Sequence, residues 1–282
     1  MMDKSRMAFL VGMPRAATTF LYHNFSRHPD IFIPFRRKTN YFSLHYENGE
    51  DYFWNHFSDV PNESIAIDTE TLAFVNRDLP SPQRIHAFNK DAKVILCVRD
   101  PGDWALSLYR QISTFDGAIP TFEQFLYGKY TLVEDNQELL FNMGPGDIAR
   151  RIEEYKTLFP DTLLILKFSD VVKYPLEALR KIESHIGVKP FYNDGNIVND
   201  KINSSDRSHS KLINKILRNE FVINIIKLLV PRAGVVYIRL AFDRISARFS
   251  GGRKEGDAGL GVLRDLASEY YSDDSRILKE YL

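Results

Sequence analysis

The chain has little cysteine, and this scarcity limits how it can be stabilised and where it works. Cys97 is the single cysteine among 282 residues, so no disulfide can form within the chain. Disulfides are frequent in oxidising surroundings and rare in the reducing cytoplasm. The sequence therefore predicts a cytoplasmic protein that is stabilised by its hydrophobic core.

A net charge is also missing. Lys and Arg together number 37, and Asp and Glu together number 37, which gives a formal charge of zero. A protein that binds nucleic acid along its phosphate backbone carries a basic surplus. The composition therefore argues against general nucleic-acid binding, although it leaves room for a local basic pocket.

Long uncharged apolar runs are absent too. A helix that spans a bilayer needs about 20 consecutive apolar residues. The nearest candidate, residues 221–242, contains Lys227 and Arg232. The apolar run near the start is followed by Pro14 and Arg15 rather than by a small-residue cleavage site, so it is a poor signal peptide. The sequence predicts no transmembrane segment. Whether residues 221–242 contact a membrane surface, a partner or the core stays open.

The sequence also lacks the residue patterns that are typical of metal-binding sites. The seven histidines and the one cysteine form neither an H-x-x-x-H pattern nor a cysteine pair. His23 and His28 are five residues apart on an expected helix, do not share a face well, and are expected at the surface. The sequence predicts no metal site.

Five short apolar runs indicate a parallel sheet. They lack the alternation of a half-exposed strand, which fits strands that are buried on both faces. Amphipathic stretches with helical spacing fill the intervals. The predicted strands are residues 7–11, 31–34, 65–68, 94–98 and 163–167. The predicted helices are residues 18–28, 82–88, 103–113, 147–158 and 176–186, and one that begins at a capping box of Thr121 and Gln124.

The length suits one domain over residues 1–282. An α/β core is expected over residues 1–190 and a mostly helical part over residues 191–282. The second part begins with a loop rich in Asn, Ser and Asp. A glycine-bearing loop near residues 250–256 precedes an expected final helix, residues 262–282.

The turn after the first predicted strand has the composition of an anion-binding loop. Its sequence is Gly12-Met13-Pro14-Arg15-Ala16-Ala17-Thr18-Thr19. A strand that enters a helix through such a turn directs backbone N–H groups and the helix dipole at one point. A Walker A loop would have glycine at Ala17 and lysine at Thr18, so an ATP-binding kinase loop is disfavoured. A tight turn with a surface Arg15 is the plainer alternative.

A second cationic segment follows the fourth predicted strand. Arg99 ends that strand, Pro101 opens a helix, and Ser107 lies on this helix. An arginine and a hydroxyl so placed can converge on one anion. Taken alone, the segment is better explained by an ordinary strand and helix with a surface pair of Arg99 and Asp103.

Together, the two segments resemble those of the sulfotransferases that use 3′-phosphoadenosine-5′-phosphosulfate (PAPS). Residues 12–19 are similar to the G-x-P-[RK]-[SAG]-[GA]-T-[TS] loop that holds the 5′-phosphosulfate. Residues 99–107 resemble the R-[DN]-P-x5-S element that holds the 3′-phosphate. The resemblance implies a three-layer α/β fold like that of P-loop NTPases, with a mainly parallel sheet flanked by helices. It also implies cofactor-binding residues, which are Pro14, Arg15, Ala16, Ala17, Thr18, Thr19, Arg99 and Ser107.

Two further segments agree with this resemblance. Residues 37–42, Arg-Lys-Thr-Asn-Tyr-Phe, look like the K-E-x-x-[FY]-F segment of the branch that sulfates heparan-type and other carbohydrates. Residues 251–254 look like the basic loop that closes over the 3′-phosphate, with Arg253 and Lys254 as cofactor ligands. We expect this loop to become ordered when the cofactor binds.

Lys38 departs from the family pattern, because it replaces the glutamate that often serves as base. A lysine cannot take a proton near neutral pH unless its pKa is strongly lowered. Lys38 is therefore expected to act as a cation near the sulfuryl group or the acceptor. Asp68 is the first alternative for the base and Glu70 the second, since parallel sheets build sites at the carboxyl ends of their strands. A loop or helix-cap role would explain Asp68 equally well.

The resemblance implies in-line transfer of a sulfuryl group from PAPS to a hydroxyl or amine of a carbohydrate, lipid or other small molecule. Positioning and electrostatics supply most of the rate in such reactions, and no metal is required. Arg15 would neutralise charge on the leaving phosphate while staying protonated. A P-loop-like nucleotide or small-molecule kinase is the alternative, with Asp100 as its acidic residue. A degenerate binding module is a third reading, supported only by Lys38.

The acceptor cannot be identified from the sequence, and neither can the oligomeric state. An aromatic group suits a sugar or lipid face, and core packing explains it at least as well. Its members are Tyr41, Phe42, Tyr46, Tyr52, Phe53 and Trp54.

Overall fold

The computed structural model describes residues 3–34, 38–112, 120–127, 130–134, 137–198 and 257–281. Most of the expected α/β core lies within these ranges. The expected closing loop with Arg253 and Lys254 lies outside the described residues, and so does segment 221–242.

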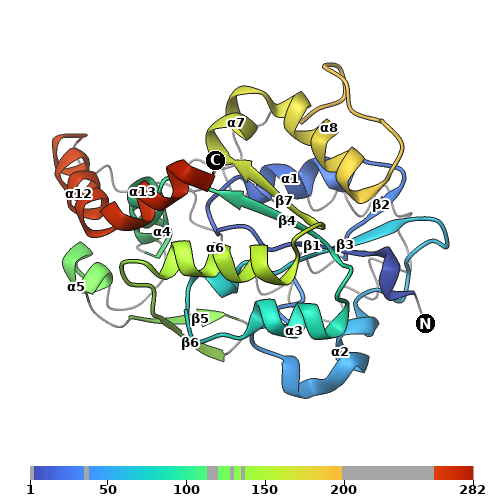
Figure 1. The fold of residues 1–282 in the computed structure, drawn as a ribbon, viewed down its shortest axis with the longest axis horizontal. Helices are drawn as coiled ribbons and strands as arrows, with labels where there is room; N and C mark the ends of the chain where they lie inside the picture. Colours follow the sequence, from blue (N-terminus) through green and yellow to red (C-terminus); the bar gives the residue numbers. More distant parts are fainter. Residues whose placement is uncertain are drawn as a thin grey trace, which may run out of the picture.

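A five-stranded parallel sheet forms the centre of the molecule (Figure 1). Its strand order is β2-β3-β1-β4-β7, and every neighbouring pair is parallel. The strands are β1 (Met7–Leu10), β2 (Ile31–Phe32), β3 (Ile65–Thr69), β4 (Lys93–Val98) and β7 (Leu163–Lys167). Each strand agrees within two residues with one expected from the apolar runs. The predicted α/β fold with a parallel sheet is therefore confirmed.

The middle strands are buried because helices cover both faces of the sheet. All four residues of β1 are buried, and Phe9 at its centre pairs with Asp68 on β3 and Val94 on β4. Parallel strands covered on both sides need apolar residues at successive positions. This requirement explains why the runs lack alternation.

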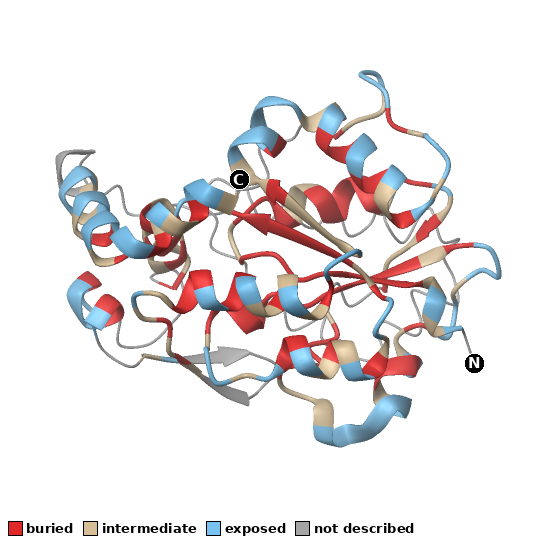
Figure 2. Cartoon of the chain, in the orientation of Figure 1, coloured by how far each residue is buried: buried red, intermediate tan, exposed pale blue. Residues whose placement is uncertain are grey.

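The helices complete a three-layer arrangement (Figure 1). On one side of the sheet lie α1 (Thr18–Phe25), α7 (Phe168–Lys173) and α8 (Pro175–Ile186), and on the other α3 (Ser81–Phe88) and α6 (Asp147–Leu158). Figure 2 shows α3, α6, α7 and α8 with exposed residues on the outside, whereas every residue of α1 is buried or half-buried. The helical spacing in the sequence thus identified the faces that pack on the sheet, and the bounds predicted for α6 are those observed.

Four more helices gather at one end of the molecule, namely α4 (Pro101–Ile112), α5 (Phe122–Tyr127), α12 (Asp257–Tyr270) and α13 (Ser272–Tyr281). The capping box before α5 is confirmed. The Thr121 N–H donates to Gln124 Oε1 at 2.9 Å, and the Gln124 N–H donates to Thr121 Oγ1 at 3.2 Å.

The expectation of one final helix over residues 262–282 is wrong, because two helices meet at Tyr271. The Tyr271 hydroxyl donates to the Met143 carbonyl at 2.8 Å. Asp274 then accepts hydrogen bonds from the backbone N–H groups of Gly146 and Ala149, at 2.7 and 2.8 Å. A carboxylate on α13 thus caps the start of α6, a partner that local sequence does not reveal.

Several elements were not predicted. They are α2 (Gly49–Asn55), α7, the antiparallel hairpin β5 (Tyr130–Glu134) with β6 (Gln137–Phe141), and the 3₁₀ turns η1 (Lys4–Arg6), η2 (Tyr46–Asn48) and η3 (Leu72–Phe74). All are short, and short elements carry weak periodic signals.

The aromatic group that suited a sugar or lipid face belongs mainly to the core. Phe42 and Phe53 are fully buried, and Tyr41 and Trp54 nearly so. The Phe42 ring meets the rings of Phe9, Phe53 and Phe88 edge-on at centroid distances of 5.3 to 5.5 Å. Core packing is therefore the better explanation for these residues.

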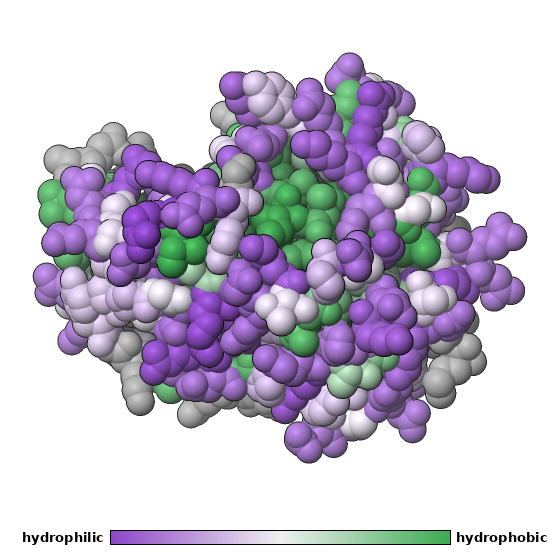
Figure 3. Space-filling model, in the orientation of Figure 1, coloured by the Kyte–Doolittle hydropathy of each residue, from purple (hydrophilic) through white to green (hydrophobic). Residues whose placement is uncertain are grey.

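The sheet edge at β7 is less covered than the middle. Leu163, Leu164 and Ile165 are only half-buried. Figure 3 shows apolar surface in a hollow in the middle of this face, where Figure 1 shows β4 and β7. In the described part of the chain, no helix combines the length and hydrophobicity that a bilayer crossing needs.

Candidate active site

The loop after β1 lies tightly against β4 because of Gly12. The N–H groups of Val11 and Met13 donate to the carbonyls of Ile95 and Cys97 at 2.9 and 3.0 Å. A Cβ atom on Gly12 would lie 2.5 Å from the Cys97 nitrogen. Only glycine permits this approach, so the first glycine of the motif fixes the course of the loop.

Two non-glycine residues of this loop have left-handed backbones. The φ angle is 68° at Arg15 and 60° at Ala17. Such conformations cost roughly 1–3 kcal/mol each and are frequent at functional sites. Ala17 precedes α1 and has no side chain that could cap it. The first turn of α1 therefore presents the arrangement that binds anions at a helix start.

The structure brings the two predicted cofactor segments together. Arg15 Nε donates to Ser107 Oγ at 3.3 Å, and Arg99 Nη1 donates to the Arg15 carbonyl at 3.1 Å. Pro14, Arg15, Thr19, Arg99 and Ser107 are half-buried, whereas the remaining loop members Ala16, Ala17 and Thr18 are buried. The two segments thus meet at one place, and their role in holding a cofactor stays a prediction.

Arg99 keeps one hydrogen-bond donor unused. Its Nε is buried and has no partner among the described residues. Its guanidinium lies over the Phe168 ring, with Cζ 4.6 Å from the ring centroid. Burial lowers the pKa of Arg99, but an arginine stays protonated at neutral pH. A fixed cation with a spare donor suits an anionic ligand.

The alternative surface pair of Arg99 and Asp103 is not formed. Asp103 instead binds Arg264 on α12 through two contacts, Nε to Oδ1 at 2.7 Å and Nη2 to Oδ2 at 3.2 Å. Asp103 therefore links α4 to α12, and Arg99 instead bonds to the Arg15 carbonyl in the loop after β1.

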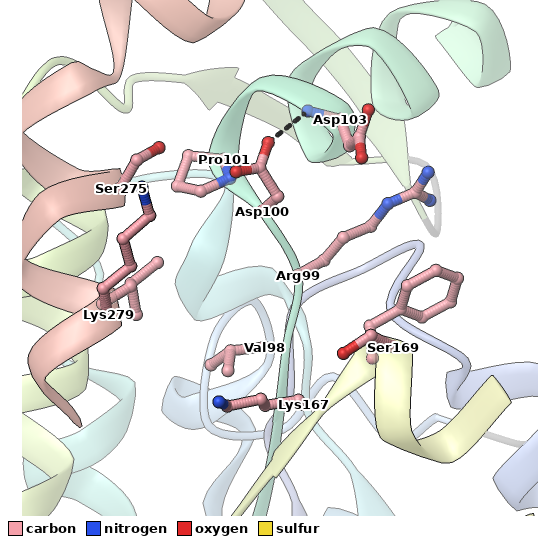
Figure 4. A pocket seen from close by; sticks show the side chains of 11 residues that line it. Val98, Arg99, Asp100, Pro101, Asp103, Lys167, Ser169, Ser275 and Lys279 are labelled. Carbon is pink, nitrogen blue, oxygen red and sulfur yellow. Dashed lines mark hydrogen bonds between the residues drawn. The ribbon is translucent and has the colours of Figure 1, made fainter. Parts of the chain in front are cut away.

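A cavity of about 250 Å³ lies at the carboxyl ends of β4 and β7 (Figure 4). Ser275 and Lys279 of α13 enter it from one side, and the Arg99 side chain points away from them. Its lining consists of Val98, Arg99, Asp100, Pro101, Asp103, Lys167, Phe168, Ser169, Ser275, Leu278 and Lys279. The sequence reasoning missed Lys167, Phe168 and Lys279. The position of the first two at the end of a predicted strand was the available signal.

Asp68 is fully buried, and both of its oxygens are engaged. Oδ2 accepts from Thr39 Oγ1 at 2.7 Å, while Oδ1 accepts from the N–H groups of Thr39 at 3.3 Å and Thr69 at 2.9 Å. Burial raises the pKa of Asp68 to about 6, even though these hydrogen bonds oppose the rise. Asp68 thus anchors the segment that follows β2.

Glu70 is also fully buried, but its surroundings differ. Neither carboxyl oxygen has a hydrogen-bond partner of standard geometry among the described residues. Burial and the nearby Asp68 raise the pKa of Glu70 to about 8, while Ser43 and Lys38 oppose the rise. The half-buried Lys38 therefore acts on a carboxyl at the end of β3.

The histidines expected at the surface are buried, which corrects that expectation. His23 is 1% exposed and His28 is 3% exposed. His28 Nε2 lies 3.1 Å from the Lys189 carbonyl and 3.4 Å from Glu183 Oε1. Within the described ranges, no group of three potential metal ligands of the types His, Cys, Asp and Glu is found.

An anion loop after the first strand of a parallel sheet, with a half-buried arginine brought to it from the end of another strand, is typical of P-loop-like proteins. The family model for the sulfotransferase domain matches residues 5–205. The chain belongs to the sulfotransferase family.

Individual relatives are distant. Human heparan sulfate glucosamine 3-O-sulfotransferase 3B1 is 25% identical over 190 residues, which cover 66% of this chain and 47% of the relative. The membrane-associated sulfotransferase kil1 of Dictyostelium discoideum is 31% identical over 103 residues, 36% of this chain and 21% of the relative. The chain thus matches about half the length of the first of these relatives and a smaller share of the second.

A solved structure supports the fold. The sulfotransferase from Alicyclobacillus acidocaldarius superposes with a TM-score of 0.52 at 16% sequence identity. The superposition covers 85% of this chain and 96% of that one. At this identity the likeness concerns the fold alone.

Proposed function

We propose that the protein transfers the sulfuryl group of PAPS to a hydroxyl or amine of an acceptor, in line and without a metal. The observation that carries this proposal is the convergence of Arg15, Arg99 and Ser107. Their mutual contacts join the loop after β1 to the segment after β4, which supports neighbouring sites for the two anionic groups of the donor. Membership in the sulfotransferase family supports sulfuryl transfer rather than the kinase alternative, whose loop would need glycine and lysine where this chain has Ala17 and Thr18.

The residues present fit the donor. The loop 14–19 and the start of α1 would hold the phosphosulfate end, where Arg15 would balance charge on the leaving phosphate. Arg99 Nε and Ser107 would hold the 3′-phosphate, and the cavity beside Phe168 would take the nucleoside. When bound, PAPS supplies the sulfuryl group and leaves as adenosine 3′,5′-bisphosphate. Arg253 and Lys254 remain predicted ligands of the 3′-phosphate. Lys38 remains a predicted cation near the sulfuryl group.

A carbohydrate hydroxyl is our first choice of acceptor, because relatives such as the human enzyme named above are called glucosamine 3-O-sulfotransferases. Lipids and other small molecules are the alternatives. A reducing cytoplasm as the working place stays a prediction from the single cysteine, and fractionation of cells checks it.

Two measurements test the proposal. Calorimetry should find that adenosine 3′,5′-bisphosphate binds more tightly than AMP or ATP, because it alone occupies both anion sites. Radiolabelled PAPS offered with sugars, lipids and phenols should then label one acceptor class. Equal or stronger binding of ATP, especially with magnesium, would contradict the proposal and favour a kinase.

A further inference from the structure

Glu70 occupies a position next to the anion loop. It is the first residue after β3, and its N–H donates to the Leu10 carbonyl at 2.9 Å. This bond continues the pairing of β1 and β3 up to the point where the loop begins at Val11. Glu70 is therefore held in register beside the loop that would receive the donor.

The carboxyl of Glu70 is fully buried without a hydrogen bond of standard geometry among the described residues. A buried polar group without a partner is costly and calls for an explanation other than packing. Asp68, which lies two residues earlier, has three hydrogen bonds and serves as an anchor. Of this pair, Glu70 is the carboxyl whose oxygens have no hydrogen bond of standard geometry in the described ranges, although the Ser43 hydroxyl and the Leu72 N–H are near enough to lower its pKa.

The charged and titratable groups around Glu70 come from three elements. Asp68 on β3 and Lys38 after β2 act on it with opposite signs. Tyr155 on α6 faces it as well, with a buried hydroxyl that lacks a partner among the described residues. Burial and Asp68 raise the pKa of Glu70 to about 8, and Lys38 pulls it down. Near neutral pH, such a carboxyl can both bind and release a proton.

We infer that Glu70 is the general base of the transfer. This inference rests on the proposed function. As the acceptor oxygen bonds to sulfur, the bond between sulfur and the 5′-phosphate oxygen breaks. The acceptor proton passes to the Glu70 carboxylate, and the phosphate departs as an anion. Glu70 then releases the proton to solvent.

The segment that carries Lys38 lies next to Glu70. Ser43, whose hydroxyl lies near the carboxyl, belongs to this segment, which Asp68 anchors through Thr39. Because Glu70 is fully buried, the scheme requires this segment to move outward before an acceptor hydroxyl can reach the carboxyl. Asp68 is thus a positioning residue in this scheme and Glu70 the catalytic one.

The test compares Glu70→Gln with Glu63→Gln, whose parent residue is exposed and lies before β3. Glu70→Gln should lower the maximal transfer rate by about 100-fold or more and flatten its pH profile. Its affinity for adenosine 3′,5′-bisphosphate should stay within about twofold of the parent, because a neutral side chain of the same shape leaves the anion loop unchanged. Glu63→Gln should match the parent in rate and profile.

Lys38→Gln supplies a second test that does not depend on the folding of Glu70→Gln. Loss of the cation should raise the pH at which the rate is half-maximal, because Glu70 then holds its proton more tightly. If Lys38→Gln leaves the pH of half-maximal rate unchanged, Lys38 does not act on the base. If the parent transfers the sulfuryl group and Glu70→Gln has the same rate and pH profile as the parent, Glu70 is not the base. If the parent binds no adenosine bisphosphate, the proposed function itself fails.

Discussion

At the residue scale, Arg99 shows how one side chain serves both structure and binding. One guanidinium nitrogen holds the Arg15 carbonyl, the plane lies on Phe168, and Nε stays available. The first two contacts fix the orientation of the third, so an anion that binds Nε meets a donor that is already in place. Because the Arg99 side chain is already held in place, it loses little conformational entropy when an anion binds.

Replacement of Arg99 by alanine should weaken adenosine 3′,5′-bisphosphate binding. A partly buried, charge-assisted hydrogen bond contributes about 2–3 kcal/mol, which corresponds to roughly 30- to 150-fold in affinity. Titration calorimetry measures the change. Arg150→Ala is the control, since Arg150 is half-exposed and pairs on the surface with Asp147 and Glu154. Binding within twofold of the parent in Arg99→Ala would refute the role of Arg99.

Arg15 should act mainly on the rate. Arg15→Ala should lower transfer at saturating PAPS by at least about 100-fold, because charge on the leaving phosphate is no longer balanced. Arg15→Gly removes the same guanidinium but accepts the left-handed φ of 68°, so it should unfold at a higher temperature than Arg15→Ala. Steady-state kinetics and thermal unfolding check the two effects. Normal turnover of Arg15→Ala with saturating donor contradicts the assignment.

At the element scale, the site exists because the backbones of separate elements come unusually close. Gly12 lets the loop lie against β4, and Gly102 lets α4 lie against α12. A Cβ on Gly102 would lie 2.4 Å from Ser268 Oγ and 3.0 Å from Ser268 Cα. The first contact places the anion loop, and the second brings the C-terminal helices to the cavity beside Arg99.

Gly12→Ala should destabilise the protein and disturb the loop. The added methyl group would meet backbone atoms of β4, which cannot rotate away, so we expect a loss of about 2 kcal/mol or more. Denaturant unfolding and calorimetry with adenosine bisphosphate measure both effects. Gly261→Ala on α12 is the control. Its methyl group enters open space, so it should stabilise the helix by up to about 1 kcal/mol. Equal stability of Gly12→Ala and the parent would contradict the close approach.

The elements that the sequence predicted are those whose signal is local. Apolar runs specify β1 and β4, and the spacing from Asp147 to Leu158 specifies α6. At the break between α12 and α13, the Tyr271 hydroxyl donates to the carbonyl of Met143, a partner that lies far away along the chain. Likewise, Asp68 and Glu70 look alike in the sequence. The hydrogen bonds from Thr39, which is distant in the sequence, engage Asp68, and Glu70 has no equivalent bond of standard geometry in the described ranges.

At the scale of the whole molecule, the parallel sheet collects the chemistry at one edge. The loop after β1, Glu70 after β3, Arg99 after β4 and Phe168 after β7 all follow carboxyl ends of strands. Burial of two carboxyls at this edge has a consequence for stability. Asp68 and Glu70 are both fully covered, and their pKa values of about 6 and about 8 lie above those of exposed carboxyls.

These raised pKa values determine the sign of the pH dependence. A carboxyl that binds its proton more tightly in the folded chain stabilises the fold fully at a pH below its unfolded pKa. The contribution of Glu70 should therefore be complete below about pH 4 and should be lost as the pH rises to about 8. The contribution of Asp68 should be lost in the same direction by about pH 6.

Glu70→Gln should accordingly flatten the stability profile between pH 5 and 8. Over this interval the parent should lose on the order of 1 kcal/mol of unfolding free energy per pH unit through Glu70. A neutral glutamine cannot ionise, so the advantage of the variant over the parent should grow as the pH rises. Urea unfolding at several pH values in this interval measures the difference. Glu63→Gln, which alters an exposed carboxyl, should follow the parent in parallel. If Glu70→Gln also runs parallel to the parent, Glu70 does not hold a proton in the folded chain at these pH values, and its burial has no influence on the acid–base behaviour of the molecule.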